Sequence, residues 1–196
     1  VGAEVLLRWN SPDIGVVPPD QFIPVAEHTG LIVPIGEWVL DQACAQLARW
    51  RAKGWKQLHV AVNVSPRQFR DARLVPLVRD ALARHGIPAP CLQIEVTEGL
   101  LVRNQSEVRA TLDALSEIGV RLAMDDFGTG YSSLSYLKRF PFDVLKIDRE
   151  FIRDLATDTD DRALVTAAIS MGRGLGLRVV AEGVETESQF SFLDAQ

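Results

Sequence analysis

Cysteine and histidine are scarce in this sequence, which contains two cysteines and three histidines among 196 residues. Cys44 and Cys91 stand far apart and in no metal-binding spacing. The sequence therefore carries neither a disulfide framework nor a zinc-finger pattern, and this cysteine usage fits a reducing compartment.

Long apolar runs and a strong excess of one charge are also missing. No apolar run approaches the roughly 20 residues that a membrane-spanning helix needs, so we expect no membrane contact by this domain. The 26 acidic and 21 basic residues give a net charge of -5, so we expect no general attraction to duplex nucleic acid. A phosphate-bearing ligand would need a local binding site.

The hydrophobic content of 47% and charged content of 24% are typical of a globular domain. Short β-branched runs alternate with segments of helical spacing, several of which end at a glycine. The runs predict six strands, at Glu4–Trp9, Leu58–Val64, Cys91–Val96, Val120–Met124, Val144–Ile147 and Arg178–Ala181. Helix ends are predicted at Gly54, Gly86, Gly119 and within 172–176, and Asn104 with Glu107 resembles a capping box. Repeated strand–helix units predict a parallel sheet covered by helices.

An open sheet and a closed barrel both satisfy this alternation, and the position of the polar residues separates the two. Five of the six predicted strands carry polar side chains at their carboxyl ends, namely Asn63, Glu95, Asp125, Asp126, Lys146 and Glu182. Barrel enzymes assemble their active sites at that end. The first strand differs because Glu4 opens it, and strand alternation predicts that Glu4, Leu6 and Arg8 share one face.

These side chains are suited to a hard cation. Glu4, Asn63, Glu95, Asp125, Asp126 and Glu182 all offer oxygen ligands, and no histidine or cysteine accompanies them. Carboxylates that are forced together repel one another unless a divalent ion neutralises them, which favours Mg²⁺ or Mn²⁺ over zinc. Two such ions roughly 3.5–4 Å apart could activate a water and stabilise the leaving oxygen of a phosphodiester. Lys146 would supply a positive charge to the transition state or orient the water.

Six motifs together resemble the signature series of the bacterial EAL domain, over essentially the whole chain. They are Glu4-Val5-Leu6-Leu7-Arg8-Trp9, Asn63-Val64-Ser65, Glu95-Val96-Thr97-Glu98, the run from Asp125-Asp126-Phe127-Gly128 to Leu134, Lys146-Ile147-Asp148, and Ala181-Glu182-Gly183-Val184-Glu185. That family consists of phosphodiesterases that cleave cyclic-di-GMP to linear pGpG and thereby lower the concentration of this second messenger. The resemblance implies a TIM-like (β/α) barrel.

The resemblance also implies a role for each motif residue. Glu4, Asn63, Glu95 and Asp125 match metal ligands, and Asp126 matches a residue at a second metal. Glu182 matches the position proposed as general base or metal ligand, Lys146 the lysine that contacts water and phosphate, and Arg8 the arginine that meets the substrate phosphate. Catalysis would thus depend on Glu182, Lys146 and Asp126. The matching supporting residues are Glu98, Glu185 and Asp148.

Cofactors and partners follow from the same resemblance. We expect two Mg²⁺ or Mn²⁺ ions, inhibition by Ca²⁺, and a homodimer formed through the Asp126–Leu134 loop region. The expected location is the bacterial cytoplasm, where the domain can be the cytoplasmic part of a larger membrane-bound or multidomain protein.

Two departures from the family pattern leave alternatives open. The name motif reads Glu-Val-Leu instead of Glu-Ala-Leu, which retains the acid. The family's barrel has one strand before Glu4 and one after Gln196, so residues 1–196 are expected to form a single, partial EAL-type domain. A degenerate EAL module that binds cyclic-di-GMP or a protein partner without cleavage is the main alternative. An enolase-like barrel with carboxylate-bound Mg²⁺ and a lysine base is a third hypothesis.

Overall fold

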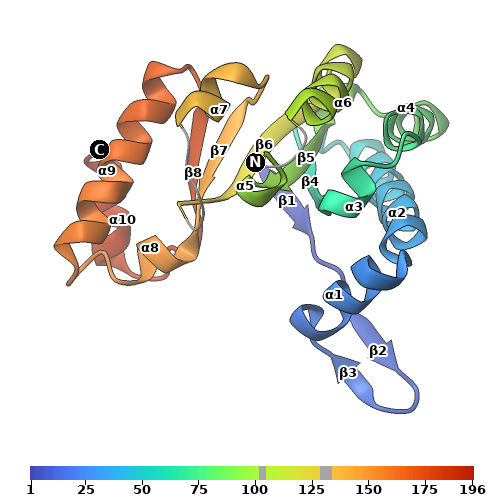
Figure 1. Cartoon of the computed structure of the whole chain (residues 1–196), viewed down its shortest axis with the longest axis horizontal. Helices are drawn as coiled ribbons and strands as arrows, with labels where there is room; N and C mark the ends of the chain where they lie inside the picture. The colour runs from blue at the N-terminus through green and yellow to red at the C-terminus, as the bar shows by residue number, and fades with distance from the viewer. Residues whose placement is uncertain (102–104, 129–133) are drawn as a thin grey trace. The chain divides into compact units, whose positions relative to one another are not determined.

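The computed structural model describes residues 1–101, 105–128 and 134–196, coloured along the chain in Figure 1. The chain divides into two compact units. The first comprises Val1–Glu95 with Ser106–Arg121, and the second comprises Val96–Gln105 with Leu122–Gln196. Each unit combines parallel strands with helices, as the sequence predicted.

Three parallel strands organise the first unit, β1 (Gly2–Val5), β4 (His59–Asn63) and β5 (Leu92–Thr97). β4 pairs with both of the others, with Glu4 opposite Ala61 and Asn63 opposite Glu95. All residues of β5 from Leu92 to Val96 are buried. Such continuous burial is typical of parallel strands that are covered on both faces.

Helices of the first unit pack against this sheet and against one another. They are α1 (Pro19–Thr29), α2 (Ile32–Ala52), α3 (Pro66–Phe69), α4 (Leu74–His85), the 3₁₀ turn η1 (Ala89–Cys91) and α6 (Gln105–Ile118). α2 contacts β4 and α4 through a buried face that includes Leu40, Cys44 and Leu47. The predicted helix ends at Gly54, Gly86 and Gly119 are confirmed, because each glycine has positive φ just beyond its helix.

The prediction for the first strand is wrong. β1 ends at Val5, and the chain continues into an antiparallel hairpin of β2 (Trp9–Ser11) and β3 (Gly15–Val17). Glu4 therefore lies near the carboxyl end of β1 instead of opening it, and Arg8 shares no strand face with it. The apolar run continues without a break through Leu6 and Leu7, whereas the pairing with β4 ends where Val5 meets Val62. A local sequence pattern does not show where the pairing with a distant strand ends.

The second unit repeats the same architecture with β6 (Arg121–Phe127), β7 (Val144–Ile147) and β8 (Arg178–Ala181), of which β7 pairs in parallel with β6 and β8. Its helices are α5 (Glu98–Leu101), α7 (Leu134–Arg139), α8 (Arg149–Arg153), α9 (Thr159–Gly174) and α10 (Glu187–Asp194). The predicted bounds of β7 and β8 are confirmed. The predicted helix end within 172–176 is also confirmed, since α9 ends at Gly174.

Within the part of the chain that the structure describes, no helix is long and apolar enough to cross a bilayer. Asn104 of the predicted capping box, and residues 129–133 of the predicted Asp126–Leu134 dimer loop, lie outside the described residues.

Candidate active site

Two of the predicted metal ligands meet at the carboxyl ends of β1 and β4. Asn63 Nδ2 donates a hydrogen bond to Glu4 Oε1 at 2.7 Å. This contact is possible because β1 and β4 run in parallel, so that their carboxyl ends lie at one edge of the sheet. The sequence placed Glu4 at the wrong end of its strand, yet the structure brings it to Asn63.

Glu95 lies on the neighbouring strand β5 and is almost completely buried, with 1% exposure. A buried carboxylate requires hydrogen-bond donors. Gln93 Nε2 donates to Glu95 Oε1 at 2.7 Å. The two side chains share a strand face because they are two residues apart. Sequence reasoning missed Gln93, although a polar residue at this spacing within an apolar strand is a signal that could have identified it.

Lys146 joins two acids at the carboxyl ends of the second unit's strands. Its Nζ lies 3.1 Å from Asp125 Oδ1 on β6 and 2.6 Å from Glu182 Oε1, directly after β8. Lys146 and Asp125 are buried, and Glu182 is partly exposed. A buried ammonium is stable only when it is paired, and here two carboxylates flank it. The sequence predicted all three residues for the site but not this double ion pair.

Asp126 adopts a backbone conformation that is uncommon for a residue other than glycine, with φ of 54°. Its backbone N–H donates to Asp125 Oδ1 at 3.0 Å, and the pairing of β6 with β7 shifts register between Met124 and Phe127. The pKa of Asp126 is raised to about 6, chiefly by burial and in addition by the nearby Asp125, Asp148 and Glu182 carboxyls. A neighbouring positive charge would stabilise the ionised form of an acid in this environment.

The remaining predicted residues have varied surroundings. Asp148 accepts a hydrogen bond from Glu150 N at 2.6 Å and so caps α8. Glu98 is buried at the start of α5, and Glu185 is exposed in the loop after β8. Arg8 is exposed, and its Nη1 donates to the carbonyl of Leu7 at 2.9 Å. A role for Arg8 at a substrate phosphate stays a prediction.

The donor chemistry of these residues fits a hard divalent cation. Glu4, Asn63, Glu95, Asp125 and Asp126 offer only carboxylate and amide oxygens. Among residues 1–101, 105–128 and 134–196, no group of three or more His, Cys, Asp or Glu side chains is gathered as a metal centre. Three of these carboxylates contact an amide or an ammonium group of the chain: Glu4 contacts Asn63, Glu95 contacts Gln93, and Asp125 contacts Lys146.

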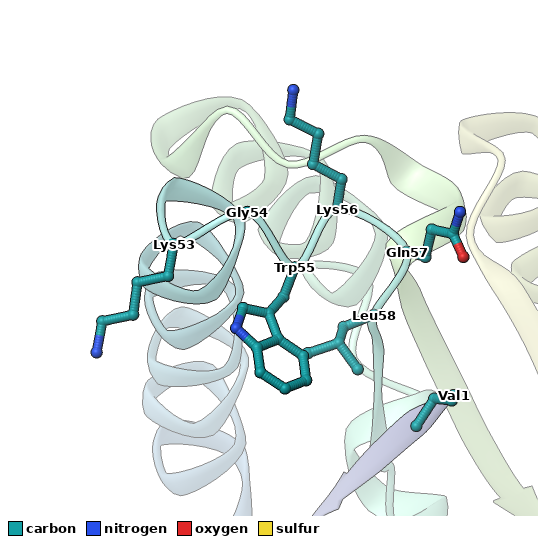
Figure 2. Close-up of a pocket in the computed structure, with 7 residues that line it drawn as sticks. All are labelled: Val1, Lys53, Gly54, Trp55, Lys56, Gln57 and Leu58. Atoms are coloured by element: carbon teal, nitrogen blue, oxygen red, sulfur yellow. The ribbon is translucent and has the colours of Figure 1, made fainter.

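A separate hollow of about 530 Å³ lies elsewhere on the first unit (Figure 2). It is lined by Val1, Lys53, Gly54, Trp55, Lys56, Gln57 and Leu58. Val1 and Leu58 precede β1 and β4, so this hollow borders the amino ends of the two strands, away from the ends that carry Glu4 and Asn63. In Figure 2 the indole of Trp55 lies toward Leu58, and the Lys53 and Lys56 side chains extend away from it. The hollow contains none of the predicted site residues.

Comparisons with known proteins show the family of the chain. The EAL domain family model matches residues 1–195. The chain is 53% identical over 193 residues to the bifunctional diguanylate cyclase/cyclic di-GMP phosphodiesterase MucR of Pseudomonas aeruginosa, covering 98% of this chain and 28% of MucR. It is 41% identical over 190 residues to the cyclic di-GMP phosphodiesterase PdeR of Escherichia coli, covering 97% of this chain and 29% of PdeR. The chain thus spans less than a third of the length of these relatives.

A solved structure described as the PaMucR phosphodiesterase in complex with c-di-GMP superposes with a TM-score of 0.94. It shares 53% identity, and the match covers 98% of this chain and 78% of that one. This likeness confirms the predicted TIM-like (β/α) barrel class. Because the family model spans nearly every residue, and because the signature acids stand at the ends of successive parallel strands, the chain belongs to the EAL domain family.

Proposed function

We propose that this domain is a metal-dependent phosphodiesterase that hydrolyses cyclic-di-GMP to linear pGpG. The observation that carries the proposal is the contact of Lys146 Nζ with both Asp125 and Glu182, at the carboxyl ends of parallel strands. The names of the relatives MucR and PdeR, and the c-di-GMP complex of the similar structure, support the same activity. Catalytic sites of (β/α) barrels lie at that end of the strands.

In the proposed reaction, a water oxygen attacks one phosphorus of the cyclic dinucleotide and the bond from that phosphorus to the 3′ oxygen breaks. Glu182 accepts the proton of the water, and the released 3′ oxygen gains a proton. Lys146 holds Glu182 in position and offsets the negative charge that develops at the phosphoryl oxygens. Arg8 binds a substrate phosphate.

A divalent ion, Mg²⁺ or Mn²⁺, would be held by Glu4, Asn63, Glu95 and Asp125, with Asp126 at a second ion. When bound, such ions lower the pKa of water and neutralise phosphate charge. Inhibition by Ca²⁺ is part of this proposal, because calcium prefers longer and more flexible coordination by the same oxygen ligands. Pairing of two copies through the Asp126–Leu134 loop region is inferred from the family resemblance alone.

The test is a comparison of purified wild type with Glu182→Gln in the presence of cyclic-di-GMP and Mn²⁺, with pGpG measured by chromatography. Loss of the proton acceptor should lower turnover on the order of 10²-fold or more. Glu187→Gln is the matched control, because Glu187 is an exposed acid in the first turn of the nearby helix α10. Equal turnover by wild type and Glu182→Gln would refute the role of Glu182.

A further inference from the structure

A buried glutamine follows the loop that carries Glu182. Gln189 lies on α10 and is only 6% exposed. Burial of a side-chain amide is unfavourable unless its oxygen and its N–H groups find partners. The partners of Gln189 therefore indicate what the residue holds together.

The oxygen and the nitrogen of this side-chain amide bind two different segments of the chain. Gln189 Oε1 accepts hydrogen bonds from the backbone N–H groups of Glu185 at 2.8 Å and Thr186 at 2.9 Å. Gln189 Nε2 donates to the carbonyl of Arg153 at 3.2 Å. The first two bonds hold the loop that follows β8, and the third reaches the last residue of α8.

The same loop is attached to β7 and α8 at two earlier points. The backbone N–H of Glu182 donates to the carbonyl of Ile147 at 3.0 Å. Gly183, with φ of 68°, lies so close to α8 that a Cβ added to it would be 2.7 Å from Arg149 Cβ. Residues 182–186 thus lie along the β7–α8 segment. Gln189 holds the end of this loop that is farthest from Glu182 in the sequence.

Lys146 belongs to β7 and Glu182 to the loop, so the 2.6 Å contact between Lys146 Nζ and Glu182 Oε1 depends on how these two segments are held together. A proton acceptor must lie within hydrogen-bond reach of its water, and a misplacement of about 1 Å can lower a rate about 10²-fold. We propose that Gln189 is a positioning residue that holds Glu182 against Lys146 for the hydrolysis. This inference rests on the proposed function.

A helix-capping role alone would be the simpler account of Gln189. Gln189 and Thr186 form a reciprocal capping box at the start of α10, in which Gln189 N donates to Thr186 Oγ1 at 3.3 Å. Thr186→Ala removes this hydroxyl but leaves the Gln189 amide in place, so it is the matched control. Positioning and capping then give different outcomes.

For Gln189→Leu we expect kcat to fall about 10-fold or more while KM changes less than about twofold, and Thr186→Ala should keep kcat within about twofold of wild type. In a Glu182→Gln background, Gln189→Leu should cause little further loss, because the residue acts through Glu182. Equal losses from Gln189→Leu and Thr186→Ala, or a full further loss in the Glu182→Gln background, would overturn the proposal.

A second variant and a structural readout keep the test independent of folding and of the substrate. Gln189→Glu keeps an oxygen acceptor for the loop but cannot donate to Arg153, and we expect it to lower kcat as well. A crystal structure of either variant should show Lys146 Nζ and Glu182 Oε1 separated beyond about 4 Å, the limit of an ion pair. An unchanged distance would overturn the positioning role. If wild type fails to cleave cyclic-di-GMP, the proposed function fails, and this distance still decides the role of Gln189.

Discussion

Lys146 contacts two of the acids proposed for the site. It is a buried cation between Asp125 and Glu182, whose side chains come from β6 and from the loop after β8. Removal of the cation leaves two carboxylates close together without an opposite charge, and such a loss at a buried pair is strongly unfavourable. Lys146 therefore links catalysis to stability.

For Lys146→Ala we expect turnover to fall on the order of 10²-fold or more and the free energy of unfolding to fall by about 3 kcal/mol. Steady-state kinetics and denaturant titration measure the two effects. Lys138→Ala is the control, because Lys138 is an exposed lysine at the end of α7. Near wild-type turnover in Lys146→Ala would contradict the assignment.

Arg8 is exposed and differs from Lys146 in the effect that we expect. A phosphate contact made in both the ground state and the transition state raises KM more than it lowers kcat. For Arg8→Ala we therefore expect a KM increase of about 10-fold with kcat within about threefold of wild type, measured with cyclic-di-GMP. Arg79→Ala, at another exposed arginine of the same unit, should change neither constant. A defect confined to kcat would show that Arg8 acts on the reaction step instead.

At the scale of helices and strands, local patterns predicted those elements whose limits are marked by residues in the sequence itself. β7 and β8 are short apolar runs flanked by polar residues, and their predicted bounds were correct. Glycines marked the helix ends in the same way. The strand predicted over Glu4–Trp9 was wrong, because its end is determined by pairing with β4, more than 50 residues away. The hairpin of β2 and β3 was missed because Trp9 was assigned to the end of that strand, whereas it pairs locally with Val17.

In the candidate site, too, some features could be predicted from local patterns and others could not. The sequence singled out the acids and the lysine as candidates because polar groups at the ends of apolar strands are conspicuous. It could not identify their partners. The bonds from Asn63 to Glu4, from Gln93 to Glu95 and from Lys146 to Glu182 depend on tertiary packing and on side-chain direction. The left-handed backbone of Asp126 was also beyond a period-based argument.

Helices α2 and α4 are joined by a polar cluster that gives a pH-dependent prediction. Asp41 Oδ1 accepts a hydrogen bond from Arg84 Nη1 at 2.7 Å. The same oxygen forms a hydrogen bond with His85 Nε2 at 2.9 Å. The hydrogen bond to His85 is the main cause that lowers the pKa of Asp41 below its ordinary value of 3.8. A lowered pKa in the folded state means that the stabilisation is present above 3.8 and is lost as the pH falls through the folded-state value.

Asp41→Asn should therefore lower Tm at about pH 5, and the difference from wild type should shrink as the pH falls below 3.8 and the native carboxylate becomes protonated. Thermal unfolding followed by circular dichroism measures both values. The effect should be small, because the cluster is partly exposed and solvent screens it. Asp80→Asn, at an exposed acid of α4, is the control. A Tm difference that grows as the pH falls would contradict the sign of this argument.

At the scale of the whole molecule, divalent ions should stabilise the fold as well as permit hydrolysis. Binding to the native state alone raises its stability by about 2.7 kcal/mol when the ligand is at 100 times its dissociation constant. We expect Mg²⁺ and Mn²⁺ to raise Tm, and we expect Glu95→Gln to reduce that rise because Glu95 is a proposed ligand. Differential scanning fluorimetry with and without a chelator measures the shift. A Tm indifferent to these ions would refute the proposed metal site.

Turnover of cyclic-di-GMP distinguishes the proposed phosphodiesterase from a module that only binds the dinucleotide. The decisive measurement is the number of pGpG molecules formed per protein chain with cyclic-di-GMP in large excess. We predict many product molecules per chain with Mg²⁺ or Mn²⁺, and little product with Ca²⁺ or a chelator. Saturable binding of cyclic-di-GMP without pGpG, in Mg²⁺ and Mn²⁺ alike, would contradict the account and would identify the domain as a binding module.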